Sequence, residues 1–369
     1  MLHVCGITYD HTINYGSSLQ AYALLRTVES MRLADGTDCS YQIIPIRTFP
    51  EWNANPSFTT LLLTPLLNLY RAQFQKFDDQ YLRFAPLASL KELPSLNRTV
   101  DAFMCGSDVV WNPDLNKQFN AFYLDFATNY KFSYAASFGK TEIDQGILDK
   151  IKKPIAELNA ISVRENAALS IVKQCTDKPA QVVVDPVLLL SEKEWMDVLS
   201  TEQRKDKYIF VYITHLSDPI KRFLKTLKEK TGLQIVYSAY GPKQAINLGV
   251  LQVQTPQKWL RLLHDAEYVV TNSFHATAFS VLFHRKFFTV VNGDPAKGIN
   301  VRMNDFLNTI GLHDRMISGM PEKMDLSEIE FTDVDSKIRS MRAESLEFLR
   351  KNLEAAHQEQ KKKQEKAHQ

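Results

Sequence analysis

The chain has few cysteines, no long apolar run and almost no net charge. Its 369 residues include only 4 cysteines, far apart and without a Cys-x-x-Cys pair, so neither a zinc site nor a disulfide framework is indicated. No run of about 18 apolar residues could span a bilayer, and the amino terminus lacks the layout of a secretory signal. A formal charge of +2 gives no reason to expect nucleic acid as a partner. These absences favour a cytoplasmic protein whose partners are defined by local sites.

The residues that are present predict two hydrophobic cores, since 44% of the chain is hydrophobic. Apolar segments of strand length alternate with segments of helical periodicity, the pattern of mostly parallel sheets covered on both faces. Strands are expected at 2–8, 41–46, 102–105, 132–136, 161–163, 182–184, 208–213, 234–237, 268–271 and 287–291, with helices at 17–31, 219–230 and 256–264. We predict an α/β protein of two Rossmann-like domains, residues 1–188 and 189–369, facing a central cleft.

Residues 57–84 interrupt this alternation with a segment of mixed apolar and basic character. Leucines and aromatic residues recur there at helical spacing beside Arg71, Lys76 and Arg83, which predicts an amphipathic helical insertion. Its apolar face would either pack on its own domain or meet a membrane or a lipid-bearing substrate.

The carboxyl end predicts a further helix followed by a polar tail. Apolar residues roughly follow helical spacing at Val334, Ile338, Met341, Leu346, Leu349 and Leu353. That face should dock on the body of the protein, whereas the last dozen residues are polar all round and are expected to be frayed or disordered. The lysines between 361 and 366 are either solvated or weakly attracted to an anionic membrane.

A histidine stands where an expected strand runs into a helix. His275 follows Asn272 and Ser273 directly after the apolar segment 268–271. Strand carboxyl ends and helix amino ends face the crevice of an open α/β sheet, where free N–H groups favour anions. A residue that titrates near neutral pH at this place favours a functional role over a structural one.

Three further strand ends carry polar residues. Residues 14–20 join the first strand to its helix, with a glycine that permits a tight turn and serines able to cap it. Asp108 follows the strand 102–105 and is either a cap or an acid or base. Arg164 and Glu165 close the strand 161–163, where the arginine either forms a salt bridge or binds a phosphate or carboxylate.

Taken together, these segments resemble the polysaccharide pyruvyltransferase family. The likeness covers most of the chain, and its motifs occur in the family's order at residues 14–24, 106–113, 133–139, 162–165, 185–190 and 273–275. Two positions depart from the pattern: Val109 stands in place of a glutamine and Ala276 in place of a glycine. Neither change removes a charged group, so we expect altered detail rather than lost chemistry.

The resemblance implies a GT-B-type fold and transfer of pyruvate from phosphoenolpyruvate to two hydroxyls of a sugar as a cyclic ketal. It implies that His275 is the general acid and that Asp108 accepts a proton from the attacking hydroxyl. The phosphoenolpyruvate would be held by Arg164, Arg302, Lys297 and Ser273. The acceptor would contact Asn14, Tyr15, Gly16, Ser17, Ser18 and Trp111. Neither a metal nor a cofactor is expected, because phosphoenolpyruvate is the co-substrate.

The family also suggests where the acceptor is found. Its members commonly modify a sugar of a polysaccharide repeat, often on a polyprenyl diphosphate at the cytoplasmic face of the membrane. Peripheral membrane contact through residues 57–84 and the lysine tail would suit that location. Galactose, glucose and N-acetylmannosamine stay open as acceptors, as does the position of the ketal.

Two alternatives use the same scaffold. A nucleotide-sugar-dependent glycosyltransferase has the same fold, although no clear acidic ribose-binding signature is present late in the second domain. A non-catalytic protein that binds glycans during their assembly is the other alternative.

Overall fold

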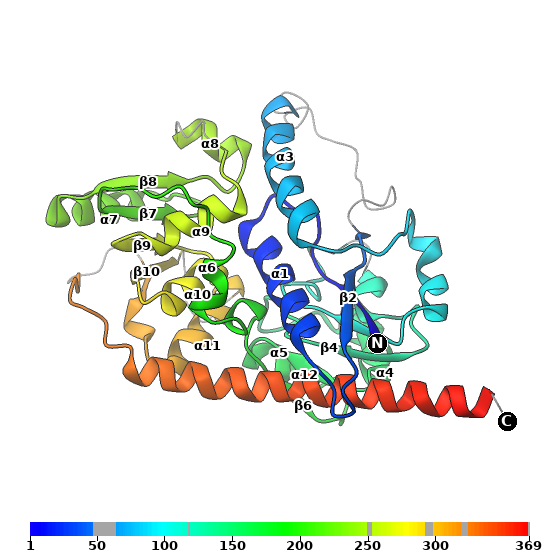
Figure 1. The fold of residues 1–369 in the computed structure, drawn as a ribbon. Coiled ribbons are helices and arrows are strands. Elements are labelled where there is room, and N and C mark those ends of the chain that lie inside the picture. Colours follow the sequence, from blue (N-terminus) through cyan, green and yellow to red (C-terminus); the bar gives the residue numbers. More distant parts are fainter. Residues whose placement is uncertain (47–63, 117–118, 249–252, 292–297, 319–323, 368–369) are drawn as a thin grey trace.

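The computed structural model describes residues 1–46, 64–116, 119–248, 253–291, 298–318 and 324–367, arranged as two α/β units joined by a long terminal helix (Figure 1). The first unit contains a parallel sheet in the order β2-β1-β3-β4. Its strands are β1 (Leu2–Ile7), β2 (Cys39–Ile43), β3 (Ala102–Cys105) and β4 (Tyr130–Ser133). A parallel pair, β5 (Ile161–Val163) and β6 (Ala180–Val182), extends the sheet through single bridges beside β4.

The second unit contains a parallel sheet in the order β11-β10-β9-β7-β8. Its strands are β7 (Tyr208–Tyr212), β8 (Gln234–Ser238), β9 (Tyr268–Thr271), β10 (Lys286–Val291) and β11 (Met316–Ser318). Every residue of β7 and β9 is buried, as expected for central strands with helices on both faces. The strand β11 was not predicted, because three residues at a sheet edge carry no detectable pattern.

The helices follow from ordinary local signals. α7 (Asp218–Thr231) has Pro219 in its first turn and ends at Gly232, whose φ of 68° is left-handed. The others of the two units are α1 (Tyr15–Ser30), α4 (Gln145–Glu157), α5 (Asn166–Val172), α6 (Glu192–Met196), α8 (Pro242–Leu248), α9 (Pro256–His264), α10 (Phe274–Leu282) and α11 (Val301–Ile310). Short 3-10 helices lie at Leu90–Arg98, Phe119–Tyr123, Pro186–Leu188, Gly298–Asn300 and His313–Arg315.

The predicted insertion forms α3 (Thr64–Tyr81), and its aromatic side chains face inward. Tyr70, Phe74 and Phe77 are buried, and the Phe74 ring lies 5.0 Å from the ring of Tyr15. Of the two predicted roles, these aromatic residues therefore have the first, packing on their own domain. The predicted residues 57–63 lie outside the described part of the chain.

Aromatic side chains from both units form the interface between them. Tyr15 of α1 stacks on Trp259 of α9 with 5.1 Å between ring centroids and 7° between planes. Trp259 in turn meets Tyr212 of β7 edge-on at 5.1 Å. The interface is thus built like a protein core.

The last helix, α12 (Thr332–Ala367), runs beneath both units (Figure 1). Its predicted apolar face docks as expected, with Leu349 and Leu353 fully buried. The expectation of a frayed or disordered end was wrong, because the helix continues to Ala367. Near its end, Lys361 contacts Asp35 of the first unit at 2.6 Å, which stabilises the last turns. The helix α12 belongs to the predicted second domain, residues 189–369, but it packs on both units. None of the described helices is long and apolar enough to cross a membrane.

Candidate active site

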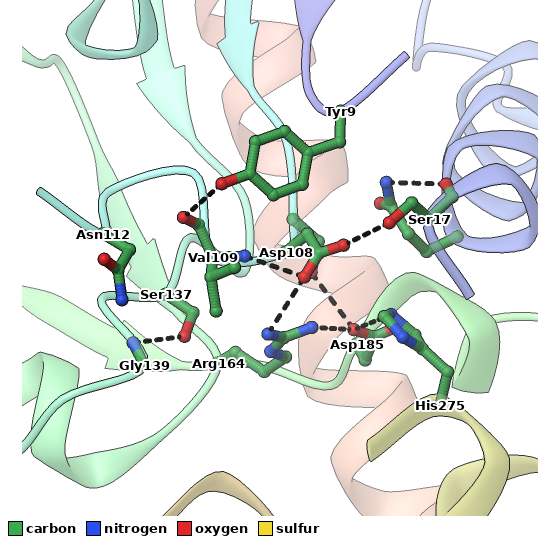
Figure 2. A network of polar contacts seen from close by, with 12 residues as sticks. Tyr9, Ser17, Asp108, Val109, Asn112, Ser137, Gly139, Arg164, Asp185 and His275 are labelled. Atoms are coloured by element: carbon green, nitrogen blue, oxygen red, sulfur yellow. Dashed lines mark hydrogen bonds and ion pairs between the residues drawn. The ribbon is translucent and has the colours of Figure 1, made fainter. Parts of the chain in front are cut away.

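The carboxyl ends of strands from both sheets meet at a cavity of about 430 Å³. α10 begins there directly after β9, and the turn after β3 brings Asp108 to the same cavity, where it belongs to a polar network with Arg164, Asp185 and His275 (Figure 2). The lining residues are Tyr9, Thr12, Ile13, Asn14, Ser17, Asp108, Val109, Leu115, Thr214, Tyr240, Asn272, Ser273, Phe274, His275, Asn300 and Arg302. The cavity therefore combines cations, a carboxylate and hydroxyl groups at one place.

Asp108 is held by two hydrogen bonds in a constrained backbone conformation. Its φ is 83°, an uncommon value outside glycine. Ser17 donates a hydrogen bond to one carboxylate oxygen at 2.7 Å, and the amide of Val109 donates to the other at 2.8 Å. Burial by itself raises the pKa of Asp108, but the positive charges of His275, Arg164 and Arg302 lower it below its ordinary value. The carboxylate is therefore charged and oriented.

His275 lies in the first turn of α10 and is almost fully buried. Ser273 caps this helix, accepting from the amide of Ala276 at 3.4 Å. The Nε2 atom of His275 lies 3.4 Å from the Asp185 carboxylate. On the side of Nδ1 the ring meets Gly16 of α1, where a Cβ would lie only 2.2 Å from that nitrogen. Both units thus define the position of the imidazole.

Arg164 does not line the cavity, which corrects the prediction that it holds the donor anion. Its side chain is 1% exposed and donates to Asp185 at 2.6 Å. It also lies 3.7 Å from the Asp108 carboxylate and 3.9 Å from that of Glu165. The guanidinium therefore faces three carboxylates and is buried away from the cavity lining.

Arg302 is the arginine that does line the cavity. Its guanidinium carbon lies 6.0 Å from the centre of the Phe274 ring, and that of Arg164 lies 4.7 Å from the same ring. Burial, followed by repulsion from Arg164, lowers the pKa of Arg302 to about 10. It is still a cation at neutral pH, and an anion in the cavity would offset its desolvation. Arg302 and the amino end of α10 therefore both bring positive electrostatic potential to the cavity.

The cluster beneath the cavity holds more carboxylates than arginines. Asp108, Glu165 and Asp185 face Arg164 and Arg302, and all five side chains are buried. Burial raises the pKa of Glu165 despite the attraction of both arginines, and Ser137 donates to this carboxyl at 2.8 Å.

The predicted acceptor contacts divide into two groups. Asn14 and Ser17 line the cavity, and Asn14 donates to the Tyr240 hydroxyl of the second unit at 3.1 Å. Three predictions were wrong. Tyr15 and Trp111 are buried in aromatic clusters, and Ser18 is buried in α1 away from the lining.

Two other predicted residues have different outcomes. Gly16 contacts His275 instead of lining the cavity, because its missing side chain makes room for the ring. Lys297 lies outside the described residues.

Among the residues that the sequence analysis missed are Tyr9 and Tyr240, which line the cavity, and Asp185, which lies behind it. Asp185 and Tyr9 follow β6 and β1 within a few residues, and Tyr240 follows β8. The rule that pointed to Asp108, a polar residue just after a strand, would have found all three. Within the described segments, no group of three or more His, Cys, Asp or Glu side chains is arranged to hold a metal ion.

Comparison with solved structures defines the class of fold. A protein described as a UDP-N-acetylglucosamine 2-epimerase of Listeria monocytogenes is similar at a TM-score of 0.54 and 9% identity, covering 96% of this chain and 89% of that one. The UDP-GlcNAc 2-epimerase of Methanocaldococcus jannaschii is similar at a TM-score of 0.50 and 9% identity, covering 92% and 91%. The fold is of the GT-B type, as the sequence predicted.

The family follows from the sequence match. The family model of polysaccharide pyruvyl transferases matches residues 14–295, which include most of the cavity lining. The chain belongs to this family. A comparison with curated proteins gives no match.

Proposed function

We propose that the protein transfers pyruvate from phosphoenolpyruvate to two hydroxyls of a sugar in a polysaccharide repeat, forming a cyclic ketal and releasing phosphate. The observation that carries this proposal is that His275 and Arg302 of the second unit line the same cavity as Asp108 and Ser17 of the first. An enol phosphate needs both a proton donor and a cationic site. A sugar hydroxyl needs an acceptor on the other side.

In this scheme the donor lies at the wall formed by the second unit. Arg302 and the first turn of α10, capped by Ser273, hold the phosphate and carboxylate. His275 gives a proton to the methylene carbon, which makes C2 electrophilic. Arg164 does not contact the donor in this scheme; it holds Asp108 and Asp185 in place.

The acceptor lies at the wall formed by the first unit. The Asp108 carboxylate accepts a hydrogen bond from the first hydroxyl, orients it toward C2 and stabilises positive charge at that carbon. Phosphate leaves as the second hydroxyl closes the ring. Of the two hydroxyl protons, one replaces the proton that His275 gave to the methyl group, and the other leaves with phosphate.

We further propose that the acceptor sugar is carried on a polyprenyl diphosphate, and that the protein works at the inner face of the membrane. Support comes from α3, where Leu69 is 56% exposed and Arg71 and Lys76 are also exposed on the same helix. A helix that exposes both a leucine and cations suits an anionic lipid surface. Leu69→Ser should therefore slow transfer to a lipid-linked acceptor and spare a short soluble one. Equal loss on both acceptors would contradict the proposal.

The reaction is tested by incubating the purified protein with phosphoenolpyruvate and candidate sugar diols. We expect release of phosphate and a gain of about 70 mass units on the acceptor, the elements of pyruvate minus water. Release of a nucleoside diphosphate from a sugar-nucleotide donor would instead identify a glycosyltransferase.

His275→Gln tests the proton donor. Because glutamine fills a similar volume but has no titratable proton, turnover should fall by roughly 10²–10⁴-fold while the circular dichroism spectrum is unchanged. The matched control is His284→Gln, a surface histidine in the same part of the chain. Near-normal turnover in folded His275→Gln would reject the assignment.

A further inference from the structure

Asp185 lies at the junction of the two units, behind the cavity wall. It immediately precedes the 3-10 helix Pro186–Leu188 and caps it, accepting from the amide of Val187 at 3.1 Å. The carboxylate is completely buried. It is absent from the cavity lining, so it touches neither a donor nor an acceptor bound there.

One oxygen of this carboxylate joins the arginine and the histidine of the site. It accepts from Arg164 at 2.6 Å and from Ser107 at 3.2 Å, and it lies 3.4 Å from Nε2 of His275 (Figure 2). Arg164 and Ser107 fix the oxygen from the first unit, whereas His275 reaches it from the second. This oxygen therefore holds the Nε2 side of the imidazole against the first unit, as Gly16 does on the Nδ1 side.

We propose that Asp185 is the positioning residue of His275, holding Nε2–H so that Nδ1 is the nitrogen that exchanges the proton, and stabilising the imidazolium form. This inference rests on the proposed function, because it assumes that the acid is His275. In the neutral ring, a proton kept on Nε2 by Asp185 leaves Nδ1 free to be recharged. Nδ1 faces Gly16, whose neighbours Tyr15 and Ser17 begin α1.

The electrostatics of the cluster support this role. Burial raises the pKa of Asp185, but His275 and Arg164 lower it further, so the pKa lies well below its ordinary value. The carboxylate is therefore ionised throughout the neutral range. The other charged groups facing this region are Asp108, Arg164, Glu165 and Arg302, and Asp185 is the carboxylate in contact with the ring.

Asp185→Asn removes the charge while keeping the shape and an oxygen for the helix cap. The protonation midpoint of His275 should move to lower pH by roughly one unit or more, because the imidazolium loses its counter-charge. The midpoint is read from the ring resonances of ¹⁵N-histidine-labelled protein, with His275 assigned by its loss in His275→Gln. The alkaline limb of the turnover profile should move by the same amount, and turnover should fall roughly 10²-fold.

Two variants separate this role from general stabilisation. Asp185→Glu keeps the charge and should leave the midpoint close to that of the natural protein. Glu165→Gln removes another buried carboxyl near Arg164, without contact to His275, and should move the midpoint by less than about 0.3 pH unit.

The outcomes distinguish the inference from the proposed function. An unchanged midpoint in folded Asp185→Asn, or an equal shift in Glu165→Gln, overturns the positioning role while the transfer assay still stands. A shifted midpoint in a protein that transfers no pyruvate supports the contact between Asp185 and His275 and instead rejects the reaction.

Discussion

Gly16 determines how closely the two units approach each other at His275. A Cβ at this position would lie 2.2 Å from Nδ1 and 2.4 Å from Cγ of the ring, so alanine must displace the imidazole or part the units. Since a displacement of about 1 Å can lower a rate by about 10²-fold, Gly16→Ala should lower turnover by that order with little change in secondary structure. Steady-state kinetics and circular dichroism measure this. Gly146→Ala, at an exposed helix start, is the control and should retain normal turnover.

Asp78 on α3 predicts how stability depends on pH. Its side chain is 1% exposed, one oxygen has no hydrogen-bond partner, and burial raises the pKa to about 7. Between about pH 4 and 7 the unfolded chain loses this proton while the folded chain keeps it, so stability falls as pH rises. Asp78→Asn should remove this loss, stabilising the protein at pH 8 by on the order of 4 kcal/mol at most.

Urea denaturation of Asp78→Asn and the natural protein at pH 4 and pH 8 tests this. The difference between the two proteins should be much smaller at pH 4, where the folded carboxyl is protonated and the unfolded one is close to its ordinary pKa of 3.8, than at pH 8. A difference independent of pH would contradict the titration of Asp78.

At the residue scale, the sequence predicted the part of the site that depends on single strand ends. His275, Asp108 and Asn14 were found because each follows a strand at an edge that must face the cleft. The burial of Arg164 could not be predicted in the same way. It depends on Asp108 and Asp185 meeting it in three dimensions, from segments far apart in the chain.

At the scale of elements, long periodic segments were predicted well and short or polar ones poorly. α7 carries both an apolar stripe and end signals, whereas β11 is three residues long. The last turns of α12 are polar, so their own sequence gave no sign of docking. They are held by contacts of His357 and Lys361 with Asp35, a residue on the opposite end of the chain.

The docking of α12 gives a prediction at this scale. Leu349 is completely buried in the core, with 0% of its side chain exposed, whereas Lys362 on the same helix is exposed. Leu349→Ala should lower the free energy of unfolding by about 2–5 kcal/mol, because it removes buried methyl groups and leaves a void. Lys362→Ala should change it by less than about 0.5 kcal/mol. Denaturant titrations of both variants measure this, and equal effects would mean that α12 is not docked in solution.

At the scale of the whole molecule, the sequence predicted two units and a cleft but not how firmly they are joined. The stacking of Tyr15 on Trp259 and the bond from Asn14 to Tyr240 cross the cleft directly. α12 then contacts both units, with Asp335 lying 2.8 Å from His284 of the second unit and Asn352 accepting from the Tyr130 hydroxyl of the first. Such an arrangement favours unfolding of the chain as one cooperative body.

A donor bound in the cavity should therefore stabilise the entire chain. Phosphoenolpyruvate at about 100 times its dissociation constant should add about 2.7 kcal/mol to the free energy of unfolding and raise Tm without splitting the transition. Arg302→Gln should abolish most of this gain, because it removes the cation that lines the cavity, whereas Arg222→Gln on the exposed face of α7 should keep it. Scanning calorimetry with and without phosphoenolpyruvate measures both effects. An equal gain in Arg302→Gln would place the donor elsewhere, and a transition that splits on binding would show that the two units unfold independently.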